Sequence, residues 1–214
     1  MRPIGVIRSP YGQKFGVPRQ AGLVPAEAVL ELDTSVIAPD AVRGLDRFSH
    51  VWVLFLFDRA TAEKAVVRPP RLGGAKKMGV LASRSPHRPN RIGMSAVELV
   101  RVEGARVVVR GGDFLDGTPL LDVKPYLPYA DAIPTATAGW AEAPLPRLEV
   151  RWAADVQWWR DLEPALARVV EEALALDPRR AGAREGSYAM RVGRWDVKCV
   201  IRAGAWEVVG VVEV

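Results

Sequence analysis

Val51-Trp52-Val53-Leu54-Phe55-Leu56-Phe57 is the stretch that decides the fold, because all of its side chains are apolar. Successive side chains of a strand point to opposite faces of a sheet, so a strand made from this stretch is apolar on both faces. It is therefore either a central strand or a strand whose second face is covered by a partner. The rest of the fold has to supply that cover.

Shorter strand-like runs lie on both sides of this stretch. Residues 27–33 alternate the apolar Ala28, Leu30 and Leu32 with charged neighbours. Short strands separated by Gly or Pro turns are typical of an all-β unit. We therefore predict a mainly β fold, with a small β-barrel or a strongly curled sheet over residues 1–135. The further runs are 4–9, 78–83, 94–102, 105–112 and 119–124.

The last third of the chain has a different pattern. Its proline-bearing start, residues 126–146, is typical of a linker. Apolar residues then recur at helical spacing, which predicts a helix over about 162–176 with Asp161 as N-cap and Pro164 in the first turn. Three strand-like runs follow this helix. We predict a small α+β domain over residues 145–214, with strands at 187–192, 195–202 and 205–213.

Composition excludes several classes of protein. Apolar residues make up 49% and charged residues 26% of the 214 positions, as in ordinary globular proteins. No run of 18 apolar residues could span a membrane, and Met1-Arg2-Pro3 has no hydrophobic signal core. The single cysteine, Cys199, permits no internal disulfide, and with His50 and His87 it is too sparse for a zinc site. We expect a cytoplasmic protein without a metal.

The net charge of +5 is unevenly distributed. Residues 1–26 and 68–97 contain no acidic residue, yet together they hold eleven of the 30 basic ones. Their Gly, Pro, Ser and Asn neighbours are typical of loops, so these cations project from connections. If the loops converge, they form a surface for phosphate, and nucleic acid is the commonest such ligand. The alternative is a set of solvated loops that never meet.

The familiar catalytic motifs are absent. The chain has no G-x-S-x-G, P-loop, H-E-x-x-H or C-x-x-C motif, and its first part has no glycine-rich turn between a strand and a helix. It has instead a series of dense and unusual sequence blocks. These are Ile4–Tyr11, Lys14–Gln20, Gly44–Trp52, Arg68–Gly74, Ser83–Asn90, Asp113–Pro119 and Asp122–Tyr129.

In this order, the blocks resemble the TrmO family, also called the TsaA-like or YaeB-like proteins. The resemblance covers about residues 3–131, and the tail is similar more loosely through Asp177-Pro178-Arg179. It implies a homodimeric S-adenosylmethionine-dependent methyltransferase on a small β-barrel. The implied substrate is tRNA, in which N6-threonylcarbamoyladenosine at position 37, beside the anticodon, gains a methyl group on the exocyclic nitrogen. Residues 1–135 would then bind the cofactor and catalyse, and residues 145–214 would recognise tRNA.

The resemblance also implies which residues bind the cofactor. Glycines in two of these segments would let the backbone approach a ligand closely, with ordinary turn geometry as the alternative. Asp113 would hold the ammonium of the methionyl part, and Phe57 or Met94 would line the adenine pocket. The full set is Gln20, Ala21, Gly22, Phe57, Asp58, Arg84, Met94, Arg110, Gly111, Gly112 and Asp113.

Methyl transfer from a sulfonium is an in-line displacement, so alignment of the reacting atoms supplies most of the acceleration. The acceptor nitrogen shares its lone pair with a purine and a carbonyl, and it therefore needs a base or a group that stabilises its anion. Two of the candidates have structural alternatives, since Lys124 could form a buried salt bridge with Asp122 and His50 could be a core histidine. The candidates are Asp113, Lys124 and Tyr126, followed by Asp116 and His50.

The cations of the acid-free loops are the candidates for RNA contact. The chain departs from the family pattern at Asp58, where His is common, and at Arg91, where a second Pro is usual. Arg180 also replaces the family's Pro, and no Tyr follows before Tyr188. These departures bear on one cofactor contact and on the range of substrates. The RNA-binding candidates are Lys14, Arg19, Arg71, His87, Arg88 and Arg91.

Two other functions remain open on the sequence alone. One is a module that binds nucleotide or RNA without turnover, and the other is an enzyme on the same barrel, including a methyltransferase for a different acceptor. The basic loops count against a small neutral substrate, which does not need them.

Overall fold

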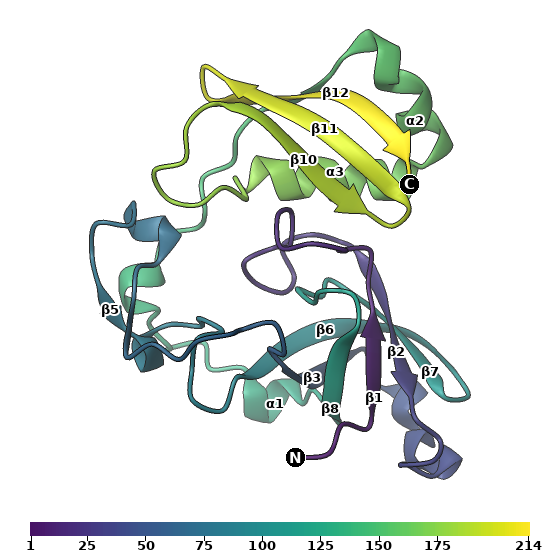
Figure 1. Ribbon diagram of the computed structural model, residues 1–214. Coiled ribbons are helices and arrows are strands. Elements are labelled where there is room, and N and C mark those ends of the chain that lie inside the picture. Colours follow the sequence, from purple (N-terminus) through teal and green to yellow (C-terminus); the bar gives the residue numbers. More distant parts are fainter.

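Six antiparallel strands close into a barrel (Figure 1). The computed structural model describes residues 1–214. In spatial order the strands are β1 (Gly5–Arg8), β2 (Glu27–Leu32), β7 (Arg106–Arg110), β6 (Ile92–Glu103), β3 (His50–Leu56) and β8 (Thr118–Pro125). Because β1 pairs with β8 as well as with β2, the sheet has no free edge. The predicted mainly β fold with a small barrel is confirmed.

The apolar stretch forms β3, which lies between β6 and β8 as a central strand. Val51, Val53 and Phe55 point into the barrel and are almost fully buried. Trp52 and Leu54 alternate with them on the outer face and are only half-buried. The chain therefore covers one face of this strand completely and leaves the other partly open.

Phe114 helps to fill the barrel interior. Its ring lies 5.0 Å from that of Phe55 in a T-shaped arrangement, which suits the charge distribution of aromatic rings. A Cβ on Gly112 would lie 2.3 Å from the Phe114 ring, so no side chain fits there. Asp113, between these two residues, is thereby fixed just beyond the end of β7.

A second sheet follows the barrel, with α-helices packed on it (Figure 1). Its strands, in spatial order, are β10 (Gly186–Val192), β11 (Trp195–Arg202), β12 (Ala205–Glu213) and β9 (Val150–Trp152). The three predicted strands of the tail are confirmed. β9 was not predicted, because it is parallel to β12 and too short to show an alternating pattern.

The predicted single helix is two helices, α2 (Gln157–Leu162) and α3 (Pro164–Ala175). Pro164 has no N–H and its ring blocks the preceding turn, so it starts a new helix instead of continuing α2. Asp161 lies inside α2, and the prediction that it caps the helix is wrong. None of the helices has both the length and the apolar character that a membrane span needs.

The segments outside the barrel and the second sheet form turns, a short helix and a two-stranded sheet. The strand predicted at 78–83 is wrong for most of its length, because β5 (Met78–Gly79) pairs with β4 (Val66–Val67) and ends in a 3-10 turn at Val80–Ala82. The predicted linker contains α1 (Pro128–Asp131) and a 3-10 turn at Gly139–Ala141, whose Trp140 Nε1–H donates to the Ala82 carbonyl at 3.0 Å. The other 3-10 turns are Pro39–Val42, Leu45–Arg47, Pro70–Leu72 and Ala154–Val156.

The connection between β1 and β2 joins the barrel to the second sheet (Figure 1). Tyr11 forms a β-bridge with Val192, and Gly193 N–H donates to the Pro10 carbonyl at 2.8 Å. Tyr11 and Val24 are buried in the hydrophobic cluster of the second sheet, not in that of the barrel. Residues 10–24 are therefore tied to both halves of the molecule.

We expect Gly16→Ala to lower the free energy of unfolding by about 2 kcal/mol or more. Gly16 has a φ of +93°, and a Cβ there would lie 2.1 Å from Met190 Sδ, so backbone strain and steric overlap add. Urea denaturation followed by circular dichroism measures the loss. Gly204→Ala is the control, since its φ is +75° but a Cβ would meet no atom within 4 Å. Equal losses in the two variants would contradict the packing of Gly16 against Met190.

Candidate functional site

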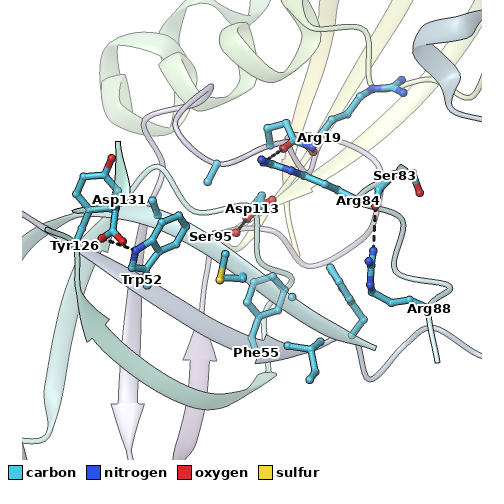
Figure 2. A pocket seen from close by; sticks show the side chains of 17 residues that line it. Arg19, Trp52, Phe55, Ser83, Arg84, Arg88, Ser95, Asp113, Tyr126 and Asp131 are labelled. Atoms are coloured by element: carbon cyan, nitrogen blue, oxygen red, sulfur yellow. Dashed lines mark hydrogen bonds between the residues drawn. The ribbon is translucent and has the colours of Figure 1, made fainter. Parts of the chain in front are cut away.

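A cavity of about 510 Å³ lies between the barrel and the connections around it (Figure 2). Its wall is made by residues 19–21, by β3 and β6, by the loop at 83–88, and by the segments around Asp113 and 126–131. This volume is within the usual range for small-molecule sites. Segments that are far apart in sequence thus meet at one place.

The cavity brings together many of the residues predicted to act there. They come from both acid-free segments, from the end of the apolar stretch 51–57 and from the end of the barrel sequence, and only the fold makes them neighbours. Arg84 Nη1, from one acid-free segment, donates to the Gln20 side-chain oxygen of the other. The loops therefore converge instead of remaining apart. The predicted residues on the cavity wall are Arg19, Gln20, Ala21, Phe57, Arg84, Arg88, Met94, Asp113 and Tyr126.

The three glycines predicted near the cofactor do not line the cavity. They lie behind its wall and fix the backbone of the residues that do line it. Gly22 N–H donates to the Gly111 carbonyl at 2.7 Å, and both residues have left-handed φ values, +79° and +87°. A Cβ on Gly111 would lie 3.4 Å from Gly22 Cα, so the two backbones are in close contact. Together with Gly112, which leaves room for the Phe114 ring, they hold Asp113 in position.

Two of the predicted charged residues are engaged outside the cavity. Lys124 Nζ lies 3.6 Å from Asp122, and both side chains are well exposed, so the prediction of a buried salt bridge is wrong. The Arg110 guanidinium binds two carboxylates on the outer surface of the barrel, and these hydrogen bonds raise its pKa. Its partners are Glu27 at 2.7 Å and Glu98 at 3.1 Å.

Three further candidates also lie off the cavity wall. His50 is exposed, with Nδ1 3.0 Å from Ser49 Oγ, so the core-histidine interpretation is wrong. Asp58 is exposed. Asp116 accepts a hydrogen bond from Ser9 N–H at 3.1 Å and braces the loop after β1.

The predicted RNA-binding residues divide into two groups. Arg19 and Arg88 line the cavity, and Arg88 Nη1 also donates to the carbonyls of Ser83 and Ser85. The others lie outside the cavity. Arg71 is half-buried in a 3-10 turn, and the side-chain nitrogens of the remaining three contact backbone carbonyls nearby. Those carbonyl contacts are Lys14 Nζ to Arg59 at 3.3 Å, His87 Nδ1 to Ala62 at 2.9 Å and Arg91 Nη1 to Ala60 at 3.0 Å.

Asp113 is the carboxylate of the cavity's polar end (Figure 2). Ser95 Oγ donates to Asp113 Oδ1 at 2.6 Å. Burial raises the pKa of Asp113, and the Ser95 hydrogen bond and the positive charge of Arg84 only partly offset this effect. The carboxylate therefore gains from any cationic group that a ligand brings next to it.

Arg19 connects the cavity to the C-terminal unit. Its Nη2 donates to the carbonyls of Asp177 and Arg179 at 2.9 and 2.7 Å, within the tail motif that the sequence analysis singled out. Burial lowers the pKa of Arg19. Part of the cavity wall therefore depends on the segment at 177–179.

An aromatic pair forms the opposite end of the cavity, and sequence reasoning missed most of it (Figure 2). The rings of Trp52 and Tyr126 lie 5.5 Å apart. Trp52 Nε1–H donates to Asp131 Oδ2 at 2.9 Å, and the same oxygen accepts Leu127 N–H at 2.8 Å. The available signal was the position of Trp52, since an indole on the outer face of a central strand needs a partner for its N–H.

The two ends differ in chemistry. One offers a desolvated carboxylate beside arginines, and the other offers flat aromatic surface. Phe55, Ile92 and Met94 add apolar surface to the wall. Such a cavity suits a ligand with a zwitterionic part and a planar ring. No group of three or more His, Cys, Asp and Glu side chains is arranged to hold a metal ion.

A family model and two curated relatives match this chain, and all three are described as methyltransferases. Residues 6–132 match the family model described as the tRNA-methyltransferase O N-terminal domain. The chain is 45% identical to the tRNA (adenine(37)-N6)-methyltransferase of Escherichia coli K12, over 96% of this chain and 94% of that protein. It is also 45% identical to a Pseudomonas aeruginosa protein named "Putative S-adenosylmethionine-dependent methyltransferase RcsF", over 91% of this chain and 88% of that protein.

A solved structure extends the similarity to the whole fold. The crystal structure of TrmO from Pseudomonas aeruginosa matches with a TM-score of 0.80 and 39% identity, over 98% of this chain and 96% of that one. The family model covers more than half of the chain, and the barrel that it describes carries the cavity. This chain belongs to the TrmO family.

Proposed function

We propose that this protein is an S-adenosylmethionine-dependent tRNA methyltransferase that methylates the exocyclic nitrogen of N6-threonylcarbamoyladenosine at position 37, beside the anticodon. The observation that carries the proposal is the cavity itself, in which a desolvated carboxylate, convergent arginines and an aromatic pair meet on the barrel of a TrmO-family chain. Such an enzyme acts where tRNA is, in the cytoplasm.

The cofactor fits the polar end of the cavity. Asp113 would bind the ammonium of the methionyl part, and Arg84 its carboxylate, because each charge then meets its opposite. Gln20 and Ala21 would contact the cofactor beside Arg84, and Phe57 or Met94 would lie against its adenine. When bound, the cofactor supplies a methyl group on a positively charged sulfur.

The residues of the chain then have to orient the acceptor nitrogen and accept its proton or stabilise the resulting anion. Positioning supplies most of the acceleration in such a displacement. Tyr126 lies on the cavity wall at the aromatic end, and it is the proposed partner of the nitrogen and its proton. Asp113, at the other end, is occupied by the ammonium of the cofactor and is not the base in this proposal. Lys124, which is exposed and paired with Asp122, has no part in this proposal.

The aromatic end suits the purine of the target nucleoside. Stacking of a base on an aromatic ring contributes about 1–3 kcal/mol. The hydrogen bond to Asp131 fixes the indole of Trp52, so that its face is presented in one orientation. Asp131 is thus a positioning residue. We further propose that residues 1–135 form the catalytic domain and that residues 145–214 recognise tRNA.

We also propose a homodimer. α3 does not cover the outer face of β3, since the buried residues of this helix belong to the hydrophobic cluster of the second sheet. Leu81 and Met94, near the cavity, are 79% and 59% exposed. A second copy of the chain would cover this apolar surface and complete the site.

Labelled S-adenosylmethionine and two tRNA preparations test the main proposal. We expect methylated nucleoside from tRNA that carries the threonylcarbamoyl group and none from tRNA that lacks it, because that group makes the nitrogen's proton more acidic. RNA binding without product would favour a binding module. Cofactor consumption with another acceptor, but not with tRNA, would favour a different methyltransferase.

Asp113→Asn should stabilise the free protein and remove its response to cofactor. Because burial raises the pKa of Asp113, the stability linked to this carboxyl is full below its ordinary value of 3.8 and is lost as pH rises through the raised one. The variant therefore gains thermal stability at neutral pH, and the gain disappears as the solution is acidified.

Thermal denaturation with and without S-adenosylmethionine measures both effects. The wild type should be stabilised by the cofactor and Asp113→Asn should not. Asp122→Asn, at an exposed carboxylate outside the cavity, is the control and should behave like the wild type. An undiminished cofactor effect in Asp113→Asn would remove Asp113 from the proposed site.

Light scattering tests the dimer. We expect twice the 23.4 kDa of one chain at micromolar concentration. Leu54→Lys places a charge on the outer face of β3 and should shift the mass towards that of one chain, whereas Val209→Lys on β12 should not. A wild type that runs as a monomer would refute this part of the proposal.

A further inference from the structure

A second cavity, of about 630 Å³, lies where the connection after β1 meets the C-terminal unit. It shares no residue with the first cavity. Its wall includes four cationic side chains and no acidic one, and the cations come from opposite ends of the sequence. They are Lys14, Arg179, Arg180 and Arg184.

Most of this positive charge is not neutralised. Arg179 binds Asp177 at 2.7 Å, but Lys14, Arg180 and Arg184 have no carboxylate within 4.0 Å. Lys14 Nζ contacts only the Arg59 carbonyl, at 3.3 Å. Three unpaired cations around one concave surface create a positive potential that attracts an anion.

Flat aromatic surface lies beside these cations. The rings of Phe15 and Tyr188, both on the cavity wall, are stacked 5.4 Å apart and only 7° from parallel. Tyr188 Oη–H donates to the Arg184 carbonyl at 2.6 Å, which fixes the loop that carries Arg184. Cations that contact phosphates together with rings that stack on bases are the combination that binds single-stranded nucleic acid.

The two cavities are close neighbours. Lys14 lines one and Arg19 the other, so even a fully extended chain separates them by at most about 18 Å. Arg19 also donates to the carbonyls of Asp177 and Arg179, next to the second cavity. One strand of RNA can therefore reach both.

We propose that this second cavity binds the ribose-phosphate backbone of tRNA next to the target nucleoside, with one base on the Phe15–Tyr188 surface. The inference rests on the proposed function and deepens it, because it assigns a separate contact for the RNA chain while the first cavity holds the cofactor and the reacting base. It also gives a role to Arg180, one of the residues at which the chain departs from the family pattern.

The test compares two double variants of equal charge. Arg180→Gln/Arg184→Gln removes two unpaired cations of the cavity, and Arg168→Gln/Arg202→Gln removes two exposed arginines that lie outside it. Binding of a fluorescent anticodon stem-loop RNA is measured by anisotropy over a series of salt concentrations.

We expect the first double variant to bind RNA about tenfold more weakly, with a salt slope reduced by about one to two units, because each phosphate contact contributes slightly less than one unit. Its KM for tRNA should rise while kcat and cofactor binding stay unchanged. Phe15→Leu should weaken binding without changing the salt slope, since stacking releases no counterions and Tyr188, which holds the Arg184 loop, is kept. The control should match the wild type.

Equal behaviour of the two double variants would overturn the inference while leaving the proposed function intact. Displacement of the RNA by micromolar inorganic phosphate or adenosine monophosphate would also overturn it, because the cavity would then serve a free phosphate ligand. A wild type that neither binds the RNA nor methylates tRNA would instead refute the proposed function.

Discussion

The hydrogen bond between Gly22 N–H and the Gly111 carbonyl sets the distance between the connection after β1 and the end of β7. Both glycines have left-handed φ values, which residues with a side chain rarely adopt, so a substitution at either would strain the backbone. Because the two backbones meet there, Ala21 and Asp113 face the same cavity. The first acid-free segment is thereby held against the barrel. Arg84, from the second acid-free segment, can then donate to the Gln20 side chain of the first.

Without a ligand, the polar end of the cavity lowers the stability of the folded protein, because it buries the charged carboxylate of Asp113. Burial makes the Asp113 carboxylate harder to ionise, and the nearby Arg84 guanidinium offsets this effect only in part. Natural proteins concentrate such unfavourable electrostatics at functional sites, where a ligand relieves them. The aromatic end is the opposite case, because the Trp52 indole and the Asp131 carboxylate satisfy each other before any ligand arrives.

The parts of the fold that local pattern determines could be predicted. The strand that is apolar on both faces was predicted to be central or covered by a partner, and it is the central strand β3. The strand-like runs at 195–202 and 205–213 are β11 and β12. β9 could not be found, since three residues show no periodicity. The contact between Trp52 and Asp131 joins residues 79 positions apart, so only the closed barrel reveals it. Several of the site residues predicted by resemblance line the cavity, but Asp58 and Arg110 lie away from it, and the glycines lie behind its wall.

The packing of residues 10–24 has a consequence for how this fold can change over evolutionary time. Tyr11 and Gly16 lie against Val192 and Met190, so an N-terminal connection and a C-terminal strand form one core. A recombination event that joined this barrel to a foreign tail would leave that connection facing the wrong surface. In this chain, the residues that one of the two segments can accept therefore depend on the residues of the other.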